Sequence, residues 1–116
     1  MDYVIACGSR EWSGDVSDVL SRYVDKSAIL ITGGARGADR LADQWAEISG
    51  IQRIIIPANW KGVGRYAGLQ RNELMISIFP VVLVIAFWDG QSRGTQDMIA
   101  RAERHHVPVK VVEMGK

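Results

Sequence analysis

The glycine-rich turn at residues 32–39, Thr-Gly-Gly-Ala-Arg-Gly-Ala-Asp, contains residue types that suit the binding of an anion. Gly33, Gly34 and Gly37 allow tight bending of the backbone and leave its N–H groups uncovered. A helix is expected directly after the turn, and the positive end of its dipole favours negative charge. We therefore expect a phosphate group at this turn, with Arg36 as a nearby cation.

Two familiar phosphate-binding motifs do not match this turn. A P-loop requires Gly-Lys-Ser or Gly-Lys-Thr, whereas the sequence here is Arg36-Gly37-Ala38. The dinucleotide fingerprint requires three glycines, but Thr32 takes the first place, and no acidic residue ends the next strand. A tight turn without a ligand therefore stays open as an alternative.

Apolar segments alternate with helical patterns along the whole chain. Strands are expected near residues 4–7, 28–32, 51–56, 81–87 and 107–112, and helices near 15–24, 37–49, 66–78 and 95–104. The alternation predicts one α/β domain over residues 1–116, a Rossmann-like doubly wound sheet of about five mostly parallel strands with helices on both faces. The segment 81–87 is apolar on both faces, so we expect it to be central.

The loops at the carboxyl ends of the predicted strands contain half of the glycines and several arginines. These loops are residues 8–10, 32–37, 58–60 and 89–95. Doubly wound sheets bind ligands beyond the carboxyl ends of their strands, so we expect the site at this edge. Arg71, on the third predicted helix, either reaches this site or pairs with Glu73 or Glu47 on the surface.

The segment Gly90-Gln-Ser92-Arg-Gly94 fits the nucleophile-elbow pattern of serine hydrolases. The two histidines of the chain, His105 and His106, are expected at the far end of the next helix, which disfavours a catalytic triad. Ser92 and Thr95 are instead expected to offer hydroxyl and N–H groups to an anion at the helix start.

Three tryptophans, Trp12, Trp60 and Trp88, follow predicted strand ends at the same edge. Each one either stacks on a flat base, which contributes about 1–3 kcal/mol in comparable cases, or covers the core beneath the loops. The sequence alone leaves both alternatives open.

Composition limits the partners and the environment that we expect. The formal net charge of +1 gives no electrostatic reason to expect nucleic acid or a membrane surface. Cys7 is the only cysteine, and no cluster of metal-binding residue types is evident, so neither a disulfide framework nor a metal site is expected. The longest apolar run, residues 81–88, is too short to span a bilayer. With no signal-peptide pattern, these features predict a cytoplasmic protein.

Five segments in order, residues 8–12, 33–39, 57–60, 67–75 and 87–95, resemble the SLOG superfamily, and most closely its YspA-like, cpYpsA-related branch. The resemblance implies a Rossmann-like sheet, a pocket for nucleotides or ADP-ribose-type ligands, and a homo-oligomer. The expected ligand-binding residues are Gly8, Ser9, Arg10, Trp12, Gly33, Gly34, Arg36, Gly37, Asp39, Trp60, Arg71, Asn72, Asp89, Gly90, Ser92, Gly94 and Thr95. No cofactor is required beyond this nucleotide-type ligand.

The LOG-type phosphoribohydrolases of the same superfamily provide a second, more distant resemblance. Their Arg-Lys-x-x-Met motif is similar to residues 71–75, with Asn72 in place of the lysine, and their Pro-Gly-Gly-x-Gly-Thr-x-x-Glu loop is similar to residues 89–98. The position of the catalytic glutamate falls on Met98, and Asp97 lies one residue earlier. Because a helix turns by about 100° per residue, Asp97 cannot simply take the place of that glutamate.

These observations favour a protein that binds a nucleotide-derived ligand as a sensor or a sequestering module. The alternative is an N-glycosidic hydrolase of nucleotides, with Asp97 or Asp39 as the acidic group and Arg71 stabilising the departing fragment. A third interpretation, DNA binding, is disfavoured by the nearly neutral charge.

Overall fold

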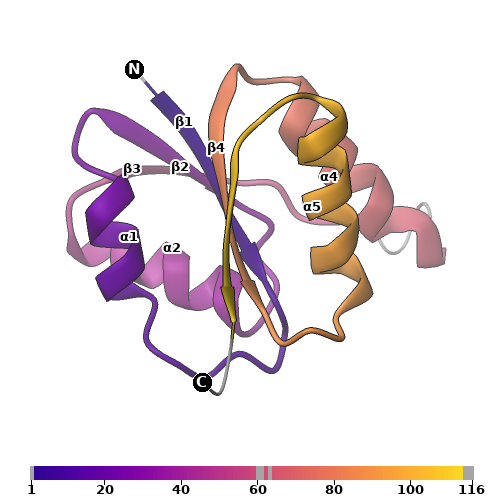
Figure 1. Cartoon of the computed structure of the whole chain (residues 1–116), viewed down its shortest axis with the longest axis horizontal. Helices are drawn as coiled ribbons and strands as arrows, with labels where there is room; N and C mark the ends of the chain where they lie inside the picture. Colours follow the sequence, from indigo (N-terminus) through magenta and orange to yellow (C-terminus); the bar gives the residue numbers. More distant parts are fainter. Residues whose placement is uncertain (1, 60–61, 63, 114–116) are drawn as a thin grey trace.

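Five strands form one sheet at the centre of the molecule (Figure 1). The computed structural model describes residues 2–59, 62 and 64–113. The strands are β1 (Asp2–Gly8), β2 (Ala28–Thr32), β3 (Gln52–Ile55), β4 (Val81–Trp88) and β5 (Val109–Glu113). Within the described chain they pair in the order β3-β2-β1-β4-β5, and every pairing is parallel. The predicted doubly wound α/β sheet is confirmed.

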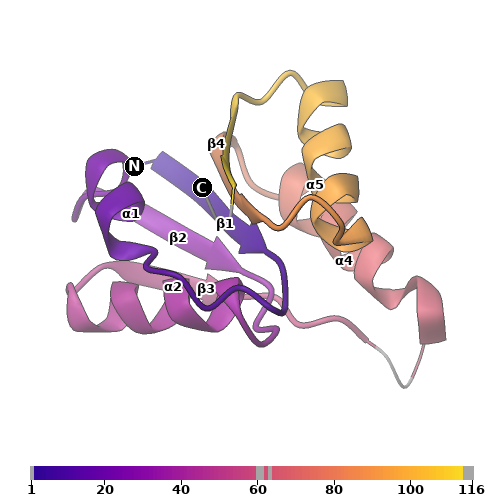
Figure 2. The same cartoon turned by 60° about the horizontal axis from the view of Figure 1, so that its bottom comes forward.

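Helices cover both faces of the sheet. Figures 1 and 2 show α1 (Ser17–Tyr23) and α2 (Ala38–Ile48) on one side, and α4 (Ala67–Ser77) and α5 (Arg93–Arg104) on the other. A short 3-10 helix, η1 (Gly64–Tyr66), leads directly into α4. None of the helices in the described part of the chain is long and apolar enough to cross a membrane.

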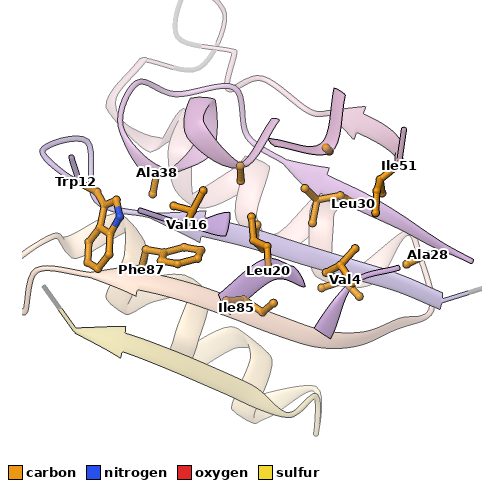
Figure 3. Packing of buried hydrophobic residues seen from close by; sticks show 14 residues of the cluster. Val4, Trp12, Val16, Leu20, Ala28, Leu30, Ala38, Ile51, Ile85 and Phe87 are labelled. Carbon is orange, nitrogen blue, oxygen red and sulfur yellow. The ribbon is translucent and has the colours of Figure 1, made fainter. Parts of the chain in front are cut away.

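Alternating side chains of β1 divide the apolar interior into two cores, because successive residues of a strand point to opposite faces. Val4 and Ala6 belong to the core beneath α1 and α2, which Figure 3 shows from close by. Ile5 and Cys7 belong to the core beneath α4 and α5. β1 is therefore covered on both faces, as expected for the middle strand of a parallel sheet.

Strand β4, which we expected to be central, pairs with β1 on one side and β5 on the other, and β1 is the middle strand. Two details of the sequence-based prediction are wrong. Helix α5 begins at Arg93, two residues before the predicted start at residue 95. The 3.6-residue periodicity of this helix also predicts Ile48 on its apolar face, together with Leu41, Ala42 and Trp45, but Ile48 is 85% exposed. The buried face of α2 contains Ala42 and Ala46, and a step of two residues beyond Ala46 turns the side chain by about 200°.

Candidate functional site

The order of the strands reverses between β1 and β4. From β1 the chain continues to β2 on one side, and from β4 it continues to β5 on the other. Their carboxyl ends are joined through Ser9, whose N–H donates to the carbonyl oxygen of Phe87 at 2.9 Å. The Ser9 hydroxyl accepts a hydrogen bond from the N–H of Asp89 at 3.0 Å. Ser9 is fully buried, so it positions the two loops.

An open cavity of about 600 Å³ lies over this edge of the sheet, a volume within the range of roughly 300–1,000 Å³ that is usual for ligand pockets. The structure brings a majority of the predicted ligand-binding residues to its wall: Gly8, Arg10, Gly33, Asp39, Arg71, Asn72, Asp89, Ser92, Gly94 and Thr95. Among the described residues, the predicted ones outside this wall are Ser9, Trp12, Gly34, Arg36, Gly37 and Gly90. Trp60 lies outside the described residues.

The predicted residues away from the wall have structural contacts of their own. Trp12 is 5% exposed and packs on Phe87 with ring centroids 5.3 Å apart, so its ring lies in the core (Figure 3). Arg36 forms a surface ion pair with Glu11 at 2.7 Å. Gly37 has a φ of 78°, and a Cβ at this position would overlap the backbone of the loop after β1.

The side chain of Asp39, the last residue of the glycine-rich turn, folds back onto the backbone of the turn. Asp39 is 3% exposed, and its Oδ2 accepts from the N–H of Ala35 at 3.3 Å. Burial raises the pKa of Asp39 to about 6, although the positive charge of Arg71 and the backbone N–H groups of Ala35, Gly33 and Gly8 act to lower it. The turn therefore already contains an anion, the carboxylate of Asp39 itself, in the first turn of α2 where negative charge is favoured.

Arg71 extends from α4 into the cavity. Its Nη1 donates to the carbonyl oxygen of Gly33 at 3.0 Å. Gly33 has no space for a side chain, because a Cβ there would overlap the Arg71 guanidinium. The two surface partners considered from the sequence are engaged elsewhere, since Glu73 pairs with Arg101 and Glu47 pairs with Arg53. Arg71 therefore lies at the cavity over the sheet edge and not in a surface ion pair with Glu73 or Glu47.

Met98, which falls at the position of the catalytic glutamate of the phosphoribohydrolases, and the adjacent Asp97 are not among the residues that line the cavity. The Oδ2 of Asp97 accepts from Arg101 at 2.7 Å and from Asn72 at 3.0 Å. Met98 is fully buried in the core beneath α4 and α5. The buried carboxyl group on the cavity wall is instead that of Asp39.

The loop after β4 is shaped by Asp89. Its Oδ1 accepts from the N–H groups of Gln91 and Ser92, each at 2.8 Å, and these bonds hold the pKa of Asp89 below its usual value. The indole Nε1 of Trp88 donates to the carbonyl oxygen of Ser92 at 3.0 Å. Trp88 therefore stabilises the loop from within.

Ser92 is the N-cap of α5. Its Oγ accepts from the N–H of Thr95 at 3.4 Å and lies 3.1 Å from the Thr95 hydroxyl. The N–H groups of Arg93 and Gly94, in the first turn, have no acceptor within the helix, and both residues line the cavity. With the helix dipole, this helix start favours an anion.

Several cavity residues escaped the sequence-based reasoning because they are apolar or aromatic: Cys7, Tyr66, Leu69 and Met75. Tyr66 is 56% exposed at the end of η1, directly before α4. Burial raises the pKa of the Cys7 thiol, so Cys7 contributes a neutral surface to the cavity. The position of Cys7 at the end of a predicted strand was the available signal, since strand ends define this edge.

Comparisons with known proteins agree with this architecture. The model of the YspA, cpYpsA-related SLOG family matches residues 3–62. The chain is 34% identical over 119 residues to the Gene 61 protein of Mycobacterium phage D29, and the match covers 94% of each chain. No solved structure gave a match. Because the family model matches more than half of the chain, the chain belongs to the YspA, cpYpsA-related SLOG family.

Proposed function

We propose that the protein binds a phosphorylated nucleoside ligand of the ADP-ribose or nucleoside-phosphate class, and acts as a sensor or a sequestering module. Membership of the SLOG family suggests nucleotide-related ligand binding in general. The observation that carries the finer proposal is the composition of one cavity wall, where a buried carboxylate, a guanidinium group and the start of a helix lie together.

Each chemical part of such a ligand has a matching group on this wall. The first turn of α5, at Arg93 and Gly94, would receive a phosphate, and Arg71 would add positive charge. Asp39 is largely ionised at neutral pH, because its pKa is about 6, and an ionised carboxylate accepts hydrogen bonds from ribose hydroxyls. Tyr66 is the exposed aromatic ring on the wall that would stack on a base.

Isothermal titration calorimetry with ADP-ribose, AMP, ribose 5-phosphate and adenosine tests the proposal. We expect ADP-ribose and AMP to bind, and adenosine to bind at least about tenfold more weakly because it lacks the charged phosphate. Ser77→Ala on α4 is a matched control, because the Ser77 hydroxyl donates to the carbonyl oxygen of Glu73 and Ser77 is not among the described residues that line the cavity. Absence of both heat and thermal shift with all four compounds would reject the proposal.

N-glycosidic hydrolysis is a second candidate, and the position of Asp39 favours it. A carboxylate with a pKa of about 6 on the cavity wall suits a general base at neutral pH. A water oxygen would form a bond to C1′ of the ribose while the C1′–N bond breaks. Asp39 would accept one proton of the water, and the base would leave with the bonding electron pair. The base of a nucleoside 5′-monophosphate would then take a proton from solvent, whereas nicotinamide would leave NAD as a neutral molecule.

Chromatography of incubations with NAD and nucleoside 5′-monophosphates tests the second candidate. Release of free base is expected to be lost in Asp39→Asn. Asp97→Asn is expected to retain part of the activity, because Asp97 does not line the cavity. An Asp39→Asn protein that is as active as the original would show that Asp39 is not the base.

A further inference from the structure

Asn72 is a buried polar residue between Arg71 and the start of α5. It is 4% exposed. Its Oδ1 accepts from the Nε of Arg71 at 3.1 Å. Its Nδ2 donates to the carbonyl oxygen of Gly94 at 3.1 Å and to the Oδ2 of Asp97 at 3.0 Å. Both hydrogens of the amide are therefore engaged by the protein itself.

Only one orientation of the Asn72 amide satisfies these contacts. If the amide were reversed, its NH₂ group would face the N–H of Arg71, and its oxygen would face two other oxygen atoms. The acceptors on Gly94 and Asp97 thus direct the Asn72 oxygen toward Arg71.

The carboxylate that orients Asn72 is itself held in place. Arg101 donates from Nε to Asp97 Oδ2 at 2.7 Å, and its Nη1 lies 3.0 Å from Glu73 Oε1. The side chains of Arg101 and Asp97 are only 19% and 20% exposed. These contacts form a continuous series from Glu73 through Arg101, Asp97 and Asn72 to Arg71.

We propose that Asn72 is a positioning residue, which sets the direction of the Arg71 guanidinium in the cavity and does not itself contact the ligand. This inference rests on the proposed function, in which Arg71 binds the phosphorylated ligand. The Oδ1 of Asn72 accepts the hydrogen bond from the Nε–H of Arg71 and thereby fixes the plane of the guanidinium. The terminal nitrogens of Arg71 then point toward Gly33 and the cavity. The role differs from the ligand contact that the sequence predicts for Asn72.

The first test needs no ligand. In the ¹⁵N–¹H spectrum of the free protein, the Nε–H of Arg71 should exchange slowly with water, because it is hydrogen-bonded to Asn72. In Asn72→Ala we expect exchange to be at least about tenfold faster, the effect of losing a hydrogen bond of ordinary strength. Ser77→Ala, which removes a different hydrogen bond of α4, should leave the exchange rate unchanged.

The second test is a double-mutant cycle with ADP-ribose as the probe. Asn72→Ala should weaken binding about tenfold, as expected when a charged group loses its orienting bond. In an Arg71→Lys background the same substitution should cost less than about twofold, because lysine has no Nε–H to orient. Equal losses in both backgrounds would indicate general structural damage and would overturn the inference.

A second variant covers the case in which Asn72→Ala does not fold. Asn72→Leu has a side chain of similar size without polar atoms, so it fills the buried space while removing the acceptor for Arg71. The Nε–H of Arg71 should again exchange at least about tenfold faster than in the original protein, and slow exchange would contradict the role assigned to Asn72. If the original protein binds none of the phosphorylated compounds, the proposed function fails, whereas the exchange measurement still decides the role of Asn72.

Discussion

The Nη1 of Arg71 donates to the carbonyl oxygen of Gly33 at 3.0 Å, which joins α4 to the turn after β2. Gly33→Ala would place a methyl group where the guanidinium now lies. We expect ADP-ribose affinity to fall about tenfold or more as Arg71 is displaced, and the free energy of unfolding to fall by at most about 1 kcal/mol, because the atoms that must move are the ends of flexible side chains and one hydrogen bond is lost. Calorimetry and urea denaturation measure the two quantities. Unchanged affinity would contradict a binding role for Arg71.

Gly94 provides a contrasting substitution. A Cβ at Gly94 would meet none of the described atoms within 4 Å beyond its own helix and chain neighbours, and alanine favours a helix over glycine by up to about 1 kcal/mol. Gly94→Ala should therefore fold at least as stably as the original protein. It should nevertheless bind AMP about tenfold more weakly, because the methyl group would stand where the phosphate approaches the N–H groups of α5. Equal affinity for AMP would place the phosphate elsewhere.

Asp39 should make the stability of the fold depend on pH. Its pKa is raised from 3.8 to about 6, so the folded state binds a proton more tightly than the unfolded state. The resulting penalty is absent below about pH 3.8, grows as the pH rises, and is complete above about pH 6. At 1.4 kcal/mol per pKa unit, it reaches about 3 kcal/mol.

Urea denaturation of the original protein and of Asp39→Asn between pH 4 and about pH 7 measures this penalty. The variant should gain stability relative to the original protein as the pH rises. Since all other acidic residues are shared, their contributions cancel in the difference. Parallel stability curves would show that the Asp39 pKa is not raised.

Two exposed apolar residues on one face of α4 bear on the predicted homo-oligomer. Leu74 and Ile78, four positions apart and therefore neighbours on the helix surface, are exposed by 45% and 55%. Such groups of apolar side chains commonly mark contact surfaces. Light scattering coupled to size-exclusion chromatography should give an oligomer that Leu74→Glu dissociates. Ile48→Glu, at an exposed position on α2, is the matched control, and a monomeric original protein would reject the prediction.

Patterns of apolar residues were sufficient to predict the succession of the strands and the four α-helices along the chain. Because parallel strands end at one edge of a sheet, the same patterns also predicted where the cavity lies. The residues around Gly8, Gly33 and Gly94 were identified in this way, and all three lie on the cavity wall.

The details that the sequence did not predict depend on side-chain directions. The glycine-rich turn suggests an anion site in any chain, and only the structure shows that the carboxylate of Asp39 fills it. The helix start at Arg93 was missed, although serine, here Ser92, is a favoured N-cap residue. Whether Trp12 stacks on a ligand or on the core depended on the path of a loop, which periodicity does not determine.

The contacts of Ser9 have a consequence for how a ligand is received. Ser9 bonds the ends of β1 and β4, and its carbonyl oxygen accepts from the N–H groups of Trp12 and Ala38 at 3.1 and 3.2 Å. The floor of the cavity is therefore preorganised when the chain folds. The conformational entropy that a mobile loop loses on binding has already been lost here, so more of the interaction free energy remains available as affinity.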